Sequence, residues 1–265
     1  MIAMKLTWLD ANSWLVEAAG KRILVDPWLV GDLVFGNAPW LVRGYRSEPI
    51  AIPKDIDLIL LSQGLADHAH PETLERLDKS IPVMASPDGA KVAESFGYQS
   101  VTGLTHGETA LFGSETDGVR VQTFVGAPVG VTKKENAYVL TFLAEDTRLY
   151  YEPHGYPDAE HLKQVGVVDV VITPMADITL FGLAPVVTGK AAAPQLANLL
   201  KPQVMLPTAE AGRVEYSGLL AGALRTSGGA DELRSQFAGK RLKTEVIQPI
   251  SGELMTLNLR SAAAV

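Results

Sequence analysis

The chain has 265 residues, of which 47% are hydrophobic and 20% charged, as in ordinary folded proteins rather than disordered ones. Its formal net charge of -7, with acidic and basic residues mixed along the chain, excludes the basic stripe on which nucleic-acid binding depends. The absence of cysteine excludes disulfides and thiolate ligands, so any metal would be held by imidazole and carboxylate groups.

The N-terminal stretch lacks the features of a signal peptide, and no apolar run reaches the roughly 20 residues that span a bilayer. We therefore expect a cytoplasmic protein that has no membrane or nucleic-acid partner and that takes a small molecule as substrate or ligand. The length fits a single α/β domain over residues 1–265. The oligomeric state is left open.

The elements predicted in chain order begin with three short strands, 5–9, 14–17 and 22–25, and continue with a long irregular loop, 26–53. The apolar run 56–61 predicts a buried strand, and a polar loop separates it from a helix over 71–77. Further strands are predicted at 83–85, 119–125, 137–142, 148–151, 168–173, 203–206 and 244–247, and helices at 88–96, 159–165, 188–200 and 231–237. This alternation indicates mixed sheets faced by helices.

The polar loop after the buried strand is the first candidate site. It reads Ser62-Gln63-Gly64-Leu65-Ala66-Asp67-His68-Ala69-His70, and His154 follows a later predicted strand in the same way. Loops at strand ends are where binding and catalytic residues are usually placed. Asp67, His68 and His154 are therefore the candidate catalytic residues.

Several segments together resemble the metallo-β-lactamase superfamily, most closely its lactonase-like and phosphoesterase-like hydrolases. They are Leu6-Thr7-Trp8-Leu9, Ile23-Leu24-Val25-Asp26-Pro27 and Ile56-Asp57-Leu58-Ile59-Leu60-Leu61-Ser62, followed by 135–140, 149–151, 168–174 and 200–207. The resemblance covers nearly the whole chain. It implies a four-layered αββα sandwich, in which two mixed sheets face each other and helices lie outside.

The family's metal loop has the form His-x-His-x-Asp-His, and here that loop is Gln63-Gly64-Leu65-Ala66-Asp67-His68. The resemblance implies that Gln63 and Leu65 replace two ligands of the first metal, and the family's middle-strand histidine has no counterpart near 126–128. Leucine has no lone pair and an amide oxygen is a poor zinc ligand. We therefore predict that the first metal position is lost.

For the second metal, the resemblance implies that two of the family's ligands, Asp67 and His68, are present in this chain. It aligns His154 with the position where the family has a bridging aspartate. The family's last histidine aligns with Thr208-Ala209-Glu210, which leaves Glu210 as the nearby ligating side chain. The hypothesis is a mononuclear zinc, manganese or iron site with water in an open position, able to hydrolyse an ester, lactone or phosphoester. Its ligands would be Asp67, His68 and His154, with Glu210, Glu152 or His70 as a fourth.

Two other interpretations stay open. In the first, Asp67 caps the helix that begins near Pro71, and His68 and His154 are buried polar residues that hydrogen-bond to each other or to Asp67. The centre would then hold no metal, and the protein would be a non-catalytic ligand-binding or regulatory protein. In the second, the same residues perform metal-free acid–base chemistry while Glu152 orients a ring nitrogen.

Three further features have both a functional and a structural interpretation. Asp26 resembles a family aspartate that supports the metal site, or it simply ends a strand. The aromatic residues of the long loop would cover an apolar substrate, or would pack on a sheet edge or a dimer partner; they are Trp28, Phe35, Trp40 and Tyr45. Lys133 and Lys134 would attract an anionic substrate or form a solvated turn.

Overall fold

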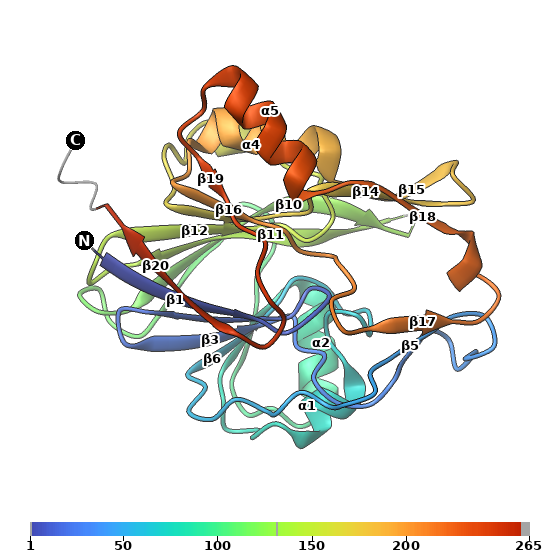
Figure 1. Ribbon diagram of the computed structural model, residues 1–265. Helices are drawn as coiled ribbons and strands as arrows, with labels where there is room; N and C mark the ends of the chain where they lie inside the picture. The colour runs from blue at the N-terminus through green and yellow to red at the C-terminus, as the bar shows by residue number, and fades with distance from the viewer. Residues whose placement is uncertain (1, 131, 261–265) are drawn as a thin grey trace.

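The computed structural model describes residues 2–130 and 132–260, and two seven-stranded sheets form its centre (Figure 1). In spatial order, the first sheet consists of β20 (Leu254–Leu259), β1 (Ile2–Trp8), β2 (Trp14–Ala18), β3 (Lys21–Val25), β6 (Leu58–Leu61), β7 (Val83–Ala85) and β8 (Val101–Gly103). The second consists of β19 (Glu245–Val246), β16 (Val204–Leu206), β13 (Val170–Ile172), β12 (Thr147–Tyr151), β11 (Lys133–Phe142), β10 (Val119–Val129) and β9 (Thr109–Phe112).

Helices cover the outer face of each sheet. Two of them, α1 (Pro71–Arg76) and α2 (Pro87–Ser95), lie on the first sheet, whereas α4 (Gly189–Leu200) and α5 (Ala230–Lys240) lie on the second (Figure 1). Apolar side chains fill the space between the two sheets, and separate apolar clusters lie beneath each helical layer. The predicted αββα sandwich is confirmed. No described helix has the length and apolar character needed to cross a membrane.

Parallel pairing brings the ends of several strands together. In the first sheet β3, β6 and β7 run parallel, and in the second β12, β13 and β16 do so. The four residues of β6 are all buried, because this strand is covered by the second sheet on one face and by helices on the other. Because the carboxyl ends of parallel strands meet at one edge, the segments after β3, β6, β12 and β16 emerge near one another.

Two small sheets were not predicted from the sequence. One contains β14 (Ala176–Leu180), β15 (Ala184–Thr188) and β18 (Leu224–Gly228), and the other contains β4 (Leu33–Val34), β5 (Arg43–Tyr45) and β17 (Glu215–Ser217). The loop expected over 26–53 therefore contains two strands, while β8, β9 and β20 were also missed and the helix expected over 159–165 ends early, as α3 (Ala159–Leu162). Most residues of β14, β15 and β18 are not buried, so these strands lack the apolar alternation on which strand prediction depends.

Candidate metal centre

Asp26 forms the base of the site, directly after β3. Its buried carboxylate accepts hydrogen bonds from the Ser62 backbone N–H at 2.7 Å, the Ser62 hydroxyl at 2.6 Å and the Tyr151 hydroxyl at 2.6 Å. It also lies 2.8 Å from Nδ1 of His68. Because Ser62 follows β6 and Tyr151 ends β12, this one side chain joins both sheets. It also fixes the His68 ring so that Nε2 remains for another partner.

Nε2 of His68 faces a second carboxylate, that of Asp67. Nε2 of His68 lies 3.2 Å from Oδ2 of Asp67, and the His68 side chain is fully buried. The Nδ1 proton is directed to Asp26, so a neutral ring would turn its Nε2 lone pair toward the Asp67 carboxylate. Although burial favours the neutral ring, Asp67 and Asp26 raise the pKa of His68 well above its ordinary value. The contact with Asp67 therefore favours a positive charge on this nitrogen, a proton or a metal ion, although Nδ2 of Asn12 also lies within hydrogen-bond distance of it, at 3.3 Å.

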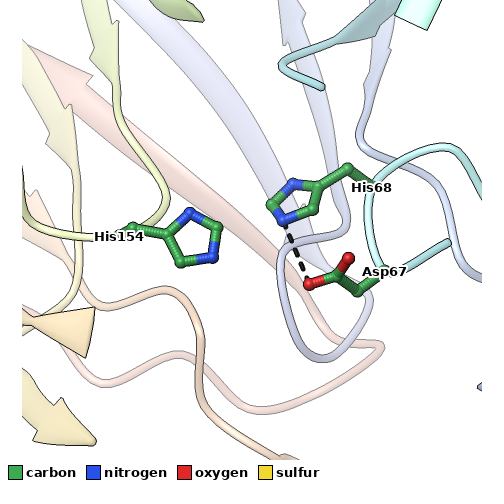
Figure 2. A group of neighbouring side chains, drawn as sticks. All are labelled: Asp67, His68 and His154. Atoms are coloured by element: carbon green, nitrogen blue, oxygen red, sulfur yellow. Dashed lines mark ion pairs between the residues drawn. The ribbon is translucent and has the colours of Figure 1, made fainter. Parts of the chain in front are cut away.

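His154 reaches the same space from the second sheet, directly after β12. Its Nδ1 lies 2.8 Å from Oε2 of Glu135, which leaves Nε2 free, and its ring centroid is 5.0 Å from that of His68. Despite burial, Glu135 raises the pKa of His154. One ligand atom from each of Asp67, His68 and His154 lies within 4.8 Å of the others, and the three side chains converge (Figure 2).

Glu152 shapes the turn that carries His154. Its Oε1 accepts the backbone N–H of His154 at 2.9 Å and its Oε2 accepts that of Gly155 at 2.7 Å. Burial and the nearby Glu135 raise the pKa of Glu152 to about 7. The hypothesis that Glu152 orients a ring nitrogen was therefore wrong, because both of its oxygens are directed to the backbone and Glu135 holds the ring.

Glu135 is the main site residue that the sequence analysis did not single out. It is fully buried, and besides His154 it accepts hydrogen bonds from Gln63 Nε2 at 3.1 Å and from the Ala127 N–H at 3.0 Å. A Cβ atom on Gly126 would lie 2.6 Å from Cγ of Glu135. Glu135 and Gln63 thus fill the space near 126–128 where the family resemblance places its missing histidine. The one sequence feature that could have drawn attention to Glu135 is a charged residue at the start of a mostly apolar strand segment, which is buried in β11.

The contact with Gly126 gives a testable result. Gly126→Ala should lower the free energy of unfolding by about 2 kcal/mol, because the added methyl overlaps Glu135. In a Glu135→Ala background the same change should cost almost nothing, since Cγ is gone. A double-mutant cycle in denaturant measures the difference, and Gly222→Ala, which meets nothing within 4 Å, is the control. An equal cost in both backgrounds would contradict the packing described.

The residues present fit one divalent cation. Asp26, Asp67 and Glu135 form no ion pair with any Lys or Arg of the described residues, and Oδ1 of Asp67 is buried without a hydrogen-bond partner. One carboxylate and two imidazoles match the three protein ligands of a catalytic zinc-type site. Each imidazole also has a carboxylate on its other nitrogen, as metal-binding histidines usually do. Gln63 and Leu65 offer no comparable donor set for a second ion.

The raised pKa values of His68 and His154 predict that thermal stability depends on pH in opposite ways with and without bound metal. Stability gained from His68 and His154 as cations is fully present below their unfolded pKa of about 6.5 and disappears as pH rises through the folded values. Metal-free protein should therefore lose thermal stability from neutral to alkaline pH, whereas zinc should stabilise more as pH rises because it displaces those protons. Thermal melts with and without zinc measure this, and His161→Ala, an exposed site, should change neither profile. Identical profiles with and without zinc would contradict it.

The other proposed ligands lie outside this group. His70 is the N-cap of α1: its Nδ1 accepts the Thr73 N–H at 3.3 Å, and its Nε2 lies 3.1 Å from the Asp32 carbonyl oxygen. The suggestion that Asp67 caps this helix was therefore wrong, because the cap position is three residues further on. The Glu210 carboxylate accepts a hydrogen bond from Gln248 at 2.7 Å.

The aromatic residues of the long loop are dispersed. Trp28 is fully buried with the Arg46 guanidinium 4.2 Å above its ring, and Phe35 is partly buried against the same apolar cluster. The Tyr45 hydroxyl donates to Glu215 at 2.9 Å, whereas Trp40 is 69% exposed. Of the two lysines, Lys133 pairs with Asp88 at 2.9 Å, and both line a cavity of about 220 Å³ beside Gln63.

Known proteins resemble this chain in sequence and in fold. The sequence profile of the beta-lactamase superfamily domain matches residues 5–209. The chain belongs to this superfamily. Within it, the chain is 27% identical over 177 residues to a UPF0173 metal-dependent hydrolase of Chelativorans sp., a match that covers 63% of this chain and 64% of that protein. A protein of the same description from Azorhizobium caulinodans is 23% identical over 190 residues, which cover 66% of this chain and 74% of that protein.

Solved structures show the same superfamily fold. The metallo hydrolase Igni18 from Ignicoccus hospitalis aligns with a TM-score of 0.69 at 14% identity and covers 97% of this chain and 100% of its own. An isothiocyanate hydrolase from Delia radicum gut bacteria aligns with a TM-score of 0.67 at 16% identity, with the same coverage. At these identities the likeness establishes the metallo-β-lactamase fold of this superfamily member.

Proposed function

We propose that this superfamily member is a mononuclear metal-dependent hydrolase of esters, lactones or phosphoesters. The observation that carries the proposal is the convergence of two imidazoles, each held by a buried carboxylate, with the Asp67 carboxylate, whose Oδ1 is buried without a hydrogen-bond partner. The three carboxylates of this arrangement pair with no Lys or Arg among the described residues, and Nε2 of His154 has no hydrogen-bond partner among them. The metal-dependent hydrolases among its relatives give the proposal further support.

Each residue would have a defined part in this function. Asp67, His68 and His154 would hold the ion, and a bound divalent ion supplies a Lewis acid that acidifies water to a pKa near 7 and polarises the substrate. Asp26 and Glu135 lie on the Nδ1 side of the two imidazoles and would keep the proton there, which would leave each Nε2 to hold the ion. Glu152 fixes the backbone beneath His154.

Exposed apolar side chains on segments around the site favour a substrate with an apolar group. Leu65 lies in the same loop as Asp67, and the β14–β15 hairpin carries Phe181 and Leu183, which are 67% and 86% exposed. The end of that hairpin contacts the site, since the Thr188 N–H donates to the His154 carbonyl at 2.9 Å. The two small sheets project from the same side of the sandwich (Figure 1). We propose that these side chains, with Trp40, contact an acyl or aryl group.

A second candidate function is ligand binding without turnover. It is favoured by the Gln63–Glu135 hydrogen bond, which closes the space of the first metal and so removes half of a dinuclear centre. A protein of this kind would bind a small molecule at the same end of the sandwich and leave it intact.

Metal analysis and hydrolysis assays separate the two. Protein purified without chelators should contain close to one equivalent of zinc, manganese or iron and should hydrolyse nitrophenyl esters, lactones or bis-nitrophenyl phosphate. Metal with no turnover of any of these substrates would favour the binding protein. Metal below about a tenth of an equivalent, with no thermal stabilisation on adding zinc, would exclude the metal centre, because an ion that binds the native state must stabilise it.

A further inference from the structure

One cavity of this chain lies away from the candidate metal centre. It measures about 340 Å³ and is lined by Ala197, Asn198, Lys201, Pro202, Gln203, Leu242, Lys243, Thr244 and Arg260. Gln203 stands immediately before β16. Thr208 follows the end of that strand, and its hydroxyl donates to Oδ1 of Asn12, whose Nδ2 lies 3.3 Å from Nε2 of His68. The cavity and the candidate metal centre are therefore at opposite ends of β16, and the cavity is independent of the proposed function.

The charge of this cavity is opposite to that of the chain. Lys201, Lys243 and Arg260 line it, and no aspartate or glutamate does. Among the described residues none of these three cations has a carboxylate oxygen within 4.0 Å, although the chain as a whole carries a formal charge of -7. Three unpaired positive charges around one cavity attract a compact anion.

Two of the polar side chains of the cavity, Gln203 and Arg260, are held in place before any ligand binds. Oε1 of Gln203 accepts hydrogen bonds from the backbone N–H of Arg260 at 2.8 Å and from its Nε at 3.3 Å, and Nε2 of Gln203 donates to the Arg260 carbonyl at 3.0 Å. Asp169 in turn accepts from Gln203 at 2.8 Å. This clamp uses the inner nitrogen of the guanidinium and leaves the two terminal ones, whose fork geometry suits phosphate.

We propose that this cavity binds a small phosphorylated molecule. The phosphate dianion would lie among the three cations, because its charge and its several acceptor oxygens match multiple donors better than a single carboxylate does. Ala197, Pro202 and Leu242 would contact the organic part of the ligand. The volume is in the range of small-molecule sites. The ligand would bind away from the reacting centre, as an effector rather than a substrate.

Titration calorimetry with phenylphosphonate tests the proposal, because this dianion has no ester bond to hydrolyse. At low salt we expect saturable binding with a Kd below about 1 mM, with inorganic phosphate weaker and benzoate weaker still. The Lys243→Gln/Arg260→Gln variant should weaken phenylphosphonate binding at least tenfold. Lys91→Gln, which changes an exposed lysine on α2 outside the cavity, should bind as the wild type does.

The Asp67→Asn variant separates the cavity from the candidate metal centre, where an anion could also bind. Unchanged binding in this variant, with loss in Lys243→Gln/Arg260→Gln, would support the cavity site. Loss of binding in Asp67→Asn would assign the anion to the metal centre and overturn the proposal. It would equally be overturned by no saturable heat up to about 10 mM, or by wild-type affinity in the double variant.

Discussion

His154→Ala should abolish stoichiometric metal binding and, with it, hydrolysis. The variant removes one of three ligand side chains, and the other ligands cannot close the gap because Asp26 and the loop after β6 hold them. We expect metal affinity to fall by more than about 100-fold, the upper range for residues that only support a ligand, and hydrolytic activity to fall at least as far. Competition with a chromogenic chelator measures the affinity.

Two further variants test whether His154 acts as a metal ligand or only supports the fold. Glu135→Gln keeps the size of the side chain but removes the charge behind His154, so its loss of metal affinity should be smaller, about 10–100-fold. In the Glu135→Gln/His154→Ala variant the loss of His154 leaves no buried charge at position 135 without its partner, which separates loss of a ligand from loss of folding. Stoichiometric metal in that folded double variant would show that His154 is not a ligand.

Asp26→Ala should destabilise the fold more than any other single change in the site. It would leave the buried Ser62 N–H without its acceptor and would remove the partner of His68. The Ser62 and Tyr151 hydroxyls would lose their shortest hydrogen bonds and keep longer contacts, with Nδ1 of His68 at 3.0 Å and the Asn12 carbonyl at 3.1 Å. An unsatisfied buried donor costs about 1–3 kcal/mol, so with the weakened hydroxyl contacts we expect a loss of about 2–4 kcal/mol in the free energy of unfolding. Urea denaturation in the presence of a chelator measures it without the metal contribution.

The control for this change must share its backbone conformation, because Asp26 has a φ of 42°, where alanine is disfavoured. Asp55 has a φ of 53° and is exposed, so Asp55→Ala reports the backbone cost alone. We expect that cost to be about 1 kcal/mol. If Asp26→Ala proved no more destabilising than Asp55→Ala, the hydrogen bonds to Asp26 would contribute no net stability.

The sandwich was predictable because its central strands carry a strong local signal. In β6 every residue is apolar and buried, and the three N-terminal strands alternate or are bounded by turn residues. The small sheets carry no such signal, since β15 leaves Ala184, Pro185 and Val186 exposed. Their strands are defined by pairing with partners far along the chain, as between β5 and β17, and a local pattern does not contain that information.

Only part of the candidate site could be predicted from the sequence. Asp67, His68 and His154 stand next to strand ends, where chemistry-bearing residues are expected, and the structure brings them together. Glu135 lies within β11, so its position gave no hint that it would reach His154. Glu210 and His70 have suitable side chains, but they form hydrogen bonds with Gln248 and Thr73 instead.

The origin of the three converging side chains has a consequence for the order of events during folding. Asp67 and His68 follow β6 in the first sheet, whereas His154 follows β12 in the second, far along the chain. No cluster of ligands exists until the two sheets have closed on each other. We predict that an ion is captured only after this closure and after the rate-limiting step, so adding zinc should slow unfolding and leave the refolding rate unchanged.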